Sequence, residues 1–158
     1  MSEKTTLCLW FDGVAEEAAR FYVPLLPDSH IDMVQKAPAD YPGGKAGDVL
    51  VVAFTLAGRS YIALNGRRQP GFTDAFSIQV HCDTQDEIDH LWQALSAHPE
   101  AEQCGWCMDR FGLSWQIVPR RMPEWLAGPN GGAVQRTFMQ MTKMRMAEIE
   151  AAARGEPT

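Results

Sequence analysis

Three polar side chains suited to a binding or catalytic site alternate with apolar ones in one short segment of the chain. Ser77, Gln79 and His81 are separated by Ile78 and Val80. Because successive side chains of a β-strand point to opposite faces of a sheet, we expect the polar groups on one face and the apolar groups on the other. A hydroxyl, an amide and an imidazole on a concave face can orient a small ligand through hydrogen bonds.

The imidazole of His81 is the group in this segment that could act as a catalyst. A histidine in a cavity can serve as a general base near neutral pH. A histidine that is only hydrogen-bonded within the fold would fit the same pattern. We therefore keep His81 both as a candidate catalytic residue and as a candidate ligand contact.

The segment expected to form the last strand repeats the alternation. Ser114 and Gln116 are expected on the polar face, whereas Trp115 and Ile117 are expected to pack against a helix. The predicted ligand contacts combine polar groups of these strands with a few residues of neighbouring segments. They are Phe11, Asn65, Ser77, Gln79, His81, Cys104, Trp106, Ser114 and Gln116.

Four cysteines, Cys8, Cys82, Cys104 and Cys107, lie mostly in apolar, strand-like runs. In a reducing compartment they would be free thiols that pack like small hydrophobic side chains. The spacing from Cys104 to Cys107 also occurs in redox and zinc motifs, but this segment is predicted as a hairpin strand and the sequence has no second pair to complete a zinc site. We predict structural packing, with Cys104 alone open to the cavity.

The elements that must position these residues occur twice in the chain. Each copy has an apolar strand, a turn with an aspartate (Asp12 and Asp83) and an amphipathic helix. The strands are predicted at about 5–11 and 76–82, and the helices at about 15–23 and 84–95. Two such halves are expected to face each other across a shared cleft. The facing of the first strand stays open, because both of its alternating sets are apolar.

Further strands follow each helix. The first half is predicted to continue with a strand at 30–36, a loop at 37–48 that is a candidate lid, and a hairpin of 49–56 with 60–64. The second half is predicted to end in a hairpin of 102–108 with 113–118. Thr84 and Glu87 have the spacing of a capping box, in which each side chain satisfies a backbone N–H of the first helical turn.

A C-terminal helix is predicted at 133–153, after a glycine-rich break. Val134, Phe138, Met141 and Ile149 would form its apolar side. A helix of this kind must pack on something, either its own barrel or a second subunit. The sequence leaves both possibilities open.

Composition narrows the class of partner. The chain has 158 residues, 46% of them hydrophobic and 22% charged, as in an ordinary globular domain. Its net charge of -6 argues against binding to nucleic acid or to anionic membranes. No stretch approaches the roughly 20 apolar residues of a membrane span, and the N-terminus lacks an apolar signal region. We expect a cytoplasmic protein that binds a small molecule or another protein.

Several motifs resemble those of one known family. They lie at 9–13, 15–22, 54–56, 63–66, 80–84, 103–106 and, as the most specific, 109–119. The duplicated plan resembles the vicinal oxygen chelate superfamily, with the glyoxalase/bleomycin resistance/dioxygenase fold. More narrowly, about residues 4–150 resemble the PhnB-like family, whose domain is also labelled 3-demethylubiquinone-9 3-methyltransferase.

The resemblance implies an α+β fold with paired βαβββ modules at 4–66 and 74–120. These modules would form one domain at 1–120, followed by a C-terminal helical extension at 121–158 and assembled as a homodimer. The methyltransferase label is not expected to describe an activity. The sequence has no glycine-rich strand-to-helix turn of the kind that holds a nucleotide-like cofactor.

Enzymes of the superfamily hold a divalent metal through His, Gln or Glu on the first and last strands of each module. The equivalent positions here fall near Thr5 or Leu7 and on Ala63, Ser77 and Gln116. Of these residues, Gln116 alone is a plausible ligand, and one amide oxygen cannot hold a catalytic ion that wants about three protein ligands. We therefore expect no catalytic metal and no cofactor.

The predicted function is binding of a small, partly apolar organic molecule in the barrel cavity. The rival prediction is an enzyme of the superfamily, either a metal-dependent lyase or dioxygenase or a metal-free acid–base catalyst that uses His81. A third possibility is a scaffold whose cavity is filled by its own side chains.

Overall fold

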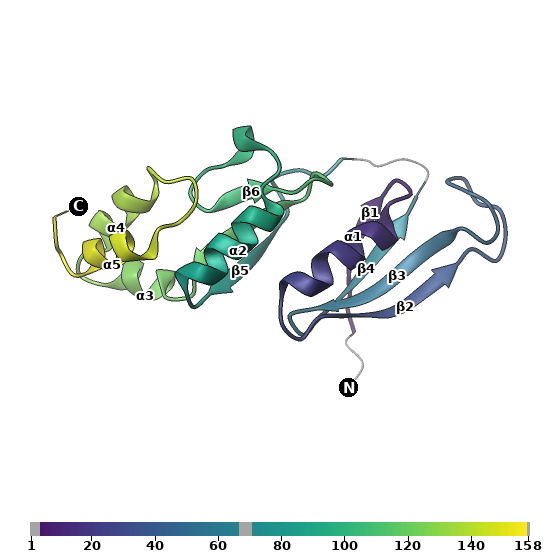
Figure 1. Ribbon diagram of the computed structural model, residues 1–158, viewed down its shortest axis with the longest axis horizontal. Helices are drawn as coiled ribbons and strands as arrows, with labels where there is room; N and C mark the ends of the chain where they lie inside the picture. The colour runs from purple at the N-terminus through teal and green to yellow at the C-terminus, as the bar shows by residue number, and fades with distance from the viewer. Residues whose placement is uncertain (1–3, 67–70, 158) are drawn as a thin grey trace. The chain divides into compact units, whose positions relative to one another are not determined.

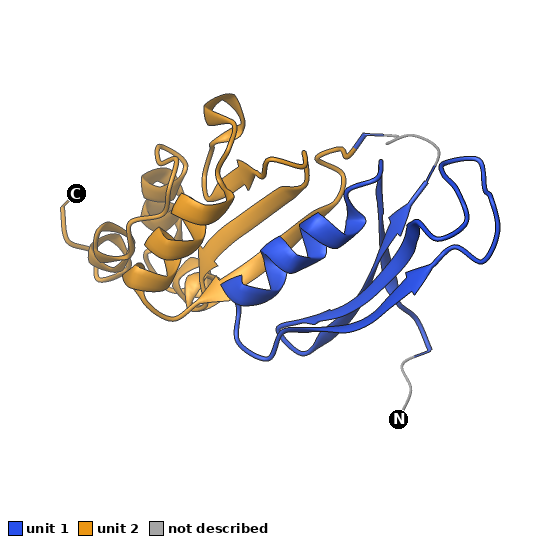
Figure 2. Ribbon diagram, turned by 45° about the vertical axis from the view of Figure 1, so that its right-hand side comes forward, with its two compact units in different colours: residues 1–71 blue, residues 72–158 orange. Residues whose placement is uncertain are grey.

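The computed structural model describes residues 4–66 and 71–157 and divides the chain into two compact units, residues 1–71 and 72–158 (Figure 2). Each unit contains one β-sheet and a helix that packs on one face of that sheet. The predicted α+β fold class is confirmed.

The first unit follows the predicted βαβββ order (Figure 1). Its elements are β1 (Leu7–Phe11), α1 (Ala15–Tyr22), the 3₁₀ helix η1 (Val23–Leu25), β2 (His30–Lys36), β3 (Val49–Leu56) and β4 (Arg59–Asn65). The sheet order is β1-β4-β3-β2, in which β1 and β4 are parallel and the other neighbours are antiparallel.

Turn residues with left-handed backbone set two of the connections in this unit. Gly13, directly after β1, has a φ of 78°, which glycine adopts without steric cost. Ala57 and Gly58, between β3 and β4, have φ values of 48° and 77°. Two consecutive left-handed residues form the hairpin turn whose twist matches that of the flanking strands.

Helix α1 packs on β3 and β4 and thereby decides the facing of β1. Leu9 and Phe11 are buried on the helix side at 2% and 0% exposure. Cys8 and Trp10, which alternate with them, are exposed. On β1, Cys8 and Trp10 therefore belong to the helix-free face of the first sheet.

The second unit has a three-stranded sheet in the part of the chain that the structure describes. Its elements are β5 (Ser77–Cys82), α2 (Gln85–Leu95), the 3₁₀ helix η2 (Pro99–Ala101), β6 (Trp106–Met108), β7 (Ser114–Pro119), α3 (Met122–Ala127), α4 (Gly131–Phe138) and α5 (Met146–Ala153). The sheet order is β5-β7-β6, with β5 parallel and β6 antiparallel to β7. In the first unit η1 and then the long strand β2 follow α1, whereas in the second unit η2 and then the short strand β6 follow α2.

Helix α2 packs on all three strands of this sheet. Its buried residues are Ile88, Leu91 and Leu95, and they meet the apolar positions of the strands, such as Trp115 and Ile117. The predicted capping box is confirmed: Thr84 Oγ1 accepts the N–H of Glu87, and the Glu87 carboxylate accepts the N–H of Thr84.

The predicted strand at 102–108 is wrong in its first half. Cys104 and Gly105 have φ values of 50° and 83° and form a tight turn between Gln103 and Trp106. Only Trp106–Met108 pairs with β7. The segment from Cys104 to Cys107 is thus a turn followed by a strand, and its cysteines do not share one strand.

The predicted helix at 133–153 is also wrong, because the chain leaves the helical path between α4 and α5. The carbonyls of Met141 and Thr142 accept the N–H groups of Cys104 and Gly105 at 2.8 Å each. The side chain of Gln85 donates to Met144 O and accepts from Met146 N. Tertiary hydrogen bonds therefore replace those of a continuous helix. Helices α3, α4 and α5 pack on one another at the C-terminal end of this unit (Figure 1).

Candidate functional site

The helix-free face of the second sheet carries the predicted alternation. We call it the polar face and define it by Ser77, Gln79, His81, Trp106, Met108, Ser114, Gln116 and Val118. The strand register pairs Ser77 with Ser114, Gln79 with Gln116, and Gln116 with Trp106. Ile78, Cys82, Trp115 and Ile117 are buried on the helix side, so the predicted facing of β5 and β7 is confirmed.

A row of hydrogen bonds connects the polar side chains across the two strands. Gln79 Nε2 donates to Gln116 Oε1 at 3.1 Å, and Gln116 Nε2 donates to Ser77 Oγ at 2.9 Å. At the same end, Ser114 Oγ donates to Asp74 Oδ1 at 3.3 Å. Because Gln116 both accepts and donates, its amide has one fixed orientation. The carbonyl oxygen of Gln79 has no hydrogen-bond partner among the described residues.

Burial varies along the polar face. Gln79 and His81 are exposed, Ser77, Gln116 and Trp106 are half-buried, and Ser114 is only 3% exposed. Exposed polar groups thus lie beside a partly shielded indole. The arrangement can offer hydrogen bonds to a ligand and an apolar surface for its ring or chain.

An ion pair that the sequence did not indicate lies at the ends of β5 and β7. Arg120 donates through Nε to Asp83 Oδ1 at 2.6 Å and through Nη2 to His81 O at 3.2 Å. The hydrogen bond from Arg120 lowers the pKa of the Asp83 carboxyl below its ordinary value. The guanidinium is therefore already engaged by a carboxylate and a carbonyl next to the polar face.

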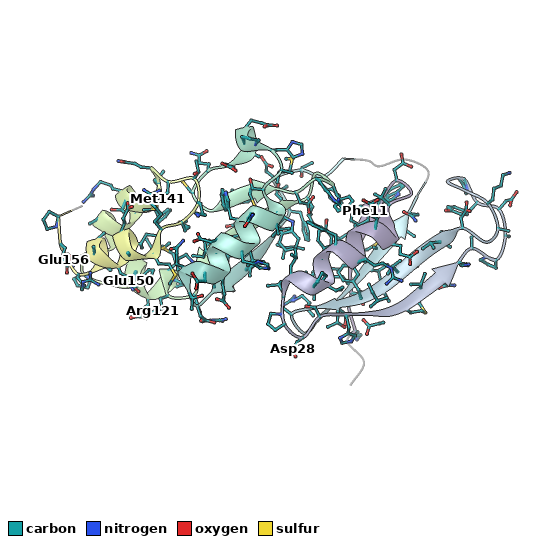
Figure 3. All side chains as sticks on the ribbon, in the orientation of Figure 1. Phe11, Asp28, Arg121, Met141, Glu150 and Glu156 are labelled. Atoms are coloured by element: carbon teal, nitrogen blue, oxygen red, sulfur yellow. The ribbon has the colours of Figure 1, made fainter. Side chains whose placement is uncertain are left out.

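Three of the predicted contacts lie elsewhere. Phe11 is fully buried on the helix side of the first sheet, beside α1 (Figure 3). Asn65 is 6% exposed; its Oδ1 accepts the N–H of Ala15 and its Nδ2 donates to Val49 O, both at 2.9 Å. Cys104 lies in its turn against the segment between α4 and α5, where its thiol donates to Met139 O at 3.4 Å.

The role of Asn65 explains how α1 begins. Val14 stands at the N-cap position of α1 and has no side chain that could accept a hydrogen bond. The first N–H groups of a helix have no partner within the helix. Asn65, from the end of β4, supplies the missing acceptor to Ala15. Sequence spacing could not reveal this contact, since 50 positions separate the two residues.

A second polar residue that sequence reasoning missed is Asp109. Its carboxylate is fully buried and accepts hydrogen bonds from Trp115 Nε1 at 2.8 Å, Phe111 N at 2.8 Å and Leu113 N at 3.1 Å. These bonds fix the turn between β6 and β7. An aspartate at the start of a glycine-containing turn is a signal for such local bonding, but the burial of the carboxylate depends on the tertiary fold.

Two thiols are buried on the helix side of the same sheet. Burial raises the pKa of Cys82 to about 12, with the nearby carboxylates of Glu87 and Asp83 adding to the effect. Burial likewise raises the pKa of Cys107 to about 12, with a further contribution from Asp109. Thiols of this kind stay protonated and unreactive near neutral pH. The prediction of structural packing agrees with these positions.

A groove of about 410 Å³ lies among α3, α5 and the segment that follows α3. Arg121 and Glu150 line it and lie at the C-terminal end of the unit (Figure 3). Both of its arginines already have carboxylate partners: Arg121 pairs with Glu124 at 2.8 Å and Arg154 with Glu156 at 2.7 Å. The groove is therefore a weak candidate for binding an anion.

The residues at the superfamily's metal positions do not fit a divalent ion. Ala63 is fully buried under α1, and Leu7 shares the helix side of β1 with Leu9, so neither position opens onto the helix-free face. In the second unit, Ser77 and Gln116 are hydrogen-bonded to each other. Among the described residues, no group of three or more His, Cys, Asp or Glu side chains is placed to hold a metal ion.

The family can be assigned from comparisons with known proteins. A family model described as 3-demethylubiquinone-9 3-methyltransferase matches residues 3–118. The chain belongs to this family. Its match ends before α3, so helices α3 to α5 lie outside the region that defines the family.

Solved structures support this assignment. The PhnB protein from Bacillus cereus is 32% identical, with 73% of this chain and 99% of that chain covered and a TM-score of 0.62. Protein PA1353 from Pseudomonas aeruginosa, at 20% identity, 75% and 98% coverage and a TM-score of 0.57, supports the fold alone. The predicted resemblance to the PhnB-like family is confirmed.

Two further searches found no match among curated proteins and, among the described residues, no membrane-spanning helix. No curated protein matches the chain. In the residues that the structure describes, none of the helices is long and apolar enough to span a membrane.

Proposed function

We propose that this PhnB-like protein binds a small, partly apolar organic molecule through the polar face of its second unit, without a catalytic metal. The observation that carries the proposal is the ordered row from Gln79 through Gln116 to Ser77, next to the indole of Trp106. The proposal retains a barrel cavity, a homodimer and a cytoplasmic location as predicted from the sequence.

The row makes the face suitable for binding because its amides are already oriented. Gln116 is held from both sides, so its side chain loses little further freedom when a ligand arrives. The exposed amide of Gln79 extends the row and has an acceptor oxygen to offer. A ligand group that donates to this oxygen would form a hydrogen bond with a group that is already in place.

The apolar part of the ligand would lie against Trp106, Met108 and Val118. Trp106 is half-buried and is paired in register with Gln116. Val118 is 8% exposed. A flat group on the indole buries apolar area while its polar edge reaches the amide row, which matches a molecule with one polar edge and one apolar body.

Methyl transfer and metal-dependent chemistry are not part of the proposal. The two sheets are small and mixed, each with one parallel strand pair, rather than a doubly wound parallel sheet of the kind that binds nucleotide-like cofactors. The superfamily's metal positions carry side chains that cannot supply about three ligands to a divalent ion.

The test uses two variants of the polar face and one matched control. Gln79→Ala and His81→Ala each remove an exposed polar group of the face, whereas Gln135→Ala removes an exposed glutamine of α4. Small molecules retained by each purified protein are identified by mass spectrometry, and their affinities are measured by calorimetry. We expect Gln79→Ala or His81→Ala to weaken binding by about 1–3 kcal/mol, and Gln135→Ala to leave it unchanged. Unchanged affinity in both face variants refutes the proposal.

A further inference from the structure

We propose that the molecule bound by the polar face is uncharged, with a hydrogen-bond donor and an acceptor on one edge. This inference rests on the function proposed above and narrows its ligand class. It follows from the charged and uncharged side chains on the helix-free faces of the two sheets.

The strand positions of the polar face carry no carboxylate, ammonium or guanidinium. They are two glutamines, two serines, one histidine and three apolar residues, as defined above. The ion pair of Asp83 with Arg120 lies just beyond the ends of β5 and β7, with 2.6 Å between Asp83 Oδ1 and Arg120 Nε. The charge of Arg120 is therefore already balanced by Asp83, which weakens this guanidinium as a partner for a ligand carboxylate or phosphate.

A carboxylate at the other end of the row acts against anions. Asp74 accepts from Ser114 at 3.3 Å, beside the pair of Ser77 and Ser114. Its negative charge disfavours a second anion on the same face. Asp74 stands before β5, outside the strand positions of the polar face, so it can attract a cation only at this edge.

In the first unit, taken by itself, three of the four strands are also uncharged on the helix-free face. The helix-free positions of β1, β4 and β3 are Cys8, Trp10, Ser60, Ile62, Leu64, Val51, Ala53 and Thr55. The charged Asp32 is on the edge strand β2, where it accepts from Thr55 Oγ1 and contacts His30, both at 2.9 Å. The helix-free positions of β1, β4 and β3, and those of β5, β7 and β6, therefore offer no counter-charge.

An ion that leaves water must gain a partner of opposite charge, or its desolvation opposes binding. An amide or a phenol loses much less on transfer and can be satisfied by neutral donors and acceptors. The exposed side-chain amide of Gln79 can both donate and accept a hydrogen bond. The face thus suits a neutral group of the amide type better than either ion.

The test uses three probes of one shape and different charge: benzamide, benzoate and benzamidine. The full-length protein is labelled with ¹⁵N, and each probe is titrated at about pH 8, where an ordinary imidazole is neutral. The readouts are the side-chain amide signals of Gln79 and Gln116 and the indole N–H of Trp106. The glutamine signals are assigned with Gln79→Ala and Gln116→Ala.

We expect benzamide to shift the Gln79 and Trp106 signals with a dissociation constant at least tenfold lower than those of benzoate and benzamidine. Equal or tighter binding of either ion at the same signals overturns the uncharged class and leaves the proposed function standing. If none of the three probes shifts these signals up to its solubility limit, the charge of a co-purified compound that does shift them decides: a charged compound makes the inference fail alone, and an uncharged one supports it. If neither the probes nor any co-purified compound shifts them, the inference and the proposed function fail together.

Discussion

The two units use polar side chains on their strands in opposite ways. In the first unit, Asn65 points to the helix side, where it is 6% exposed and bonds to Ala15 and Val49. In the second unit, Gln79 and Gln116 point to the helix-free face and bond to each other. One amide builds the fold, and the others form a surface that can meet a ligand.

The difference follows from how each helix is capped. Helix α2 is capped locally by Thr84 and Glu87, so its sheet need not supply a polar group to the helix. Helix α1 begins after Val14, which cannot cap, so Asn65 must come from β4. A polar strand residue is therefore a ligand candidate only when its face of the sheet is free of the helix. Asn65 fails this criterion, although the sequence suggested it as a contact.

The largest expected difference between the helix side and the helix-free face of the sheets is in the reactivity of their cysteine thiols. Cys82 and Cys107 lie on the helix side at 1% exposure each, with pKa values raised to about 12, whereas Cys8 is exposed on a helix-free face. Near pH 8 the thiolate fraction of a thiol with such a pKa is roughly a thousandfold below that of an ordinary cysteine. We expect iodoacetamide to label Cys8 in the folded protein and to label Cys82 and Cys107 only after unfolding, as measured by peptide mass spectrometry.

A Cys104→Ala background removes the half-buried fourth thiol and simplifies the measurement. Burial also raises the pKa of Cys8, so its labelling is expected to be slower than that of a free peptide. Labelling of Cys82 in the folded protein at the rate of Cys8 would mean that the assigned faces of β1 and β5 are wrong.

The next effect separates the structural amide from the surface amides. Asn65→Ala removes an acceptor and a donor in a buried setting and leaves Ala15 N–H and Val49 O without this partner. We expect the free energy of unfolding to fall by about 2–4 kcal/mol, measured by urea denaturation. Gln116→Ala removes half-buried bonds that water can replace, and should cost about 0.5–1.5 kcal/mol. If both variants lose the same free energy of unfolding, the hydrogen-bonded row of the polar face stabilises the fold as much as Asn65 does, which contradicts the distinction.

A smaller effect is expected at the local cap of α2. Thr84→Ala removes the acceptor for Glu87 N–H at an exposed position and should lower stability by about 1 kcal/mol. Thr84→Ser keeps the hydroxyl and serves as the control, with a change close to zero. A loss in Thr84→Ala as large as that in Asn65→Ala would contradict the view that the local cap is the less critical of the two.

Much of the fold follows from local patterns in the sequence. The strand at 30–36 and the capping box of α2 agree with prediction because each depends on neighbouring residues. The polar face of β5 was also predictable, since polar and apolar residues alternate there and the helix can accept only the apolar set. In β1 both sets are apolar, and only packing against α1 distinguishes Leu9 from Trp10.

The errors have a common cause in contacts between distant segments. The helix predicted at 133–153 is interrupted where Gln85 binds the backbone at Met144 and Met146. The strand predicted at 102–108 is shortened where Cys104 and Gly105 donate to the same segment of the chain. The segment between α4 and α5 has no proline or glycine to indicate its break. Gly105, by contrast, was a signal within the sequence for a bulge or turn in the second case.

The smallest effect concerns the aspartates that follow β1 and β5 in the duplicated plan. Asp83 is paired with Arg120, whose hydrogen bond lowers the pKa of the Asp83 carboxyl below its ordinary value of 3.8. Asp12, at the equivalent place, has no ion pair among the described residues. A lowered folded-state pKa adds stability that is present above the unfolded value and is lost as the pH falls through the folded value. We therefore expect Asp83→Asn to be slightly less stable than the parent protein near pH 7.

This difference should disappear as the pH falls below about 3.8 and through the lower folded-state pKa of Asp83, because the parent carboxyl is then protonated as well. Urea denaturation midpoints measured from about pH 7 to about pH 3 would follow the change. Asp12→Asn is the matched control and removes a carboxylate that has no arginine partner among the described residues, so it should cost less stability near pH 7 than Asp83→Asn. If both variants behave alike, the ion pair at the end of β5 contributes nothing measurable, as is common for exposed pairs. Asp83 would then be bonded to Arg120 without stabilising the strand ends beside the polar face.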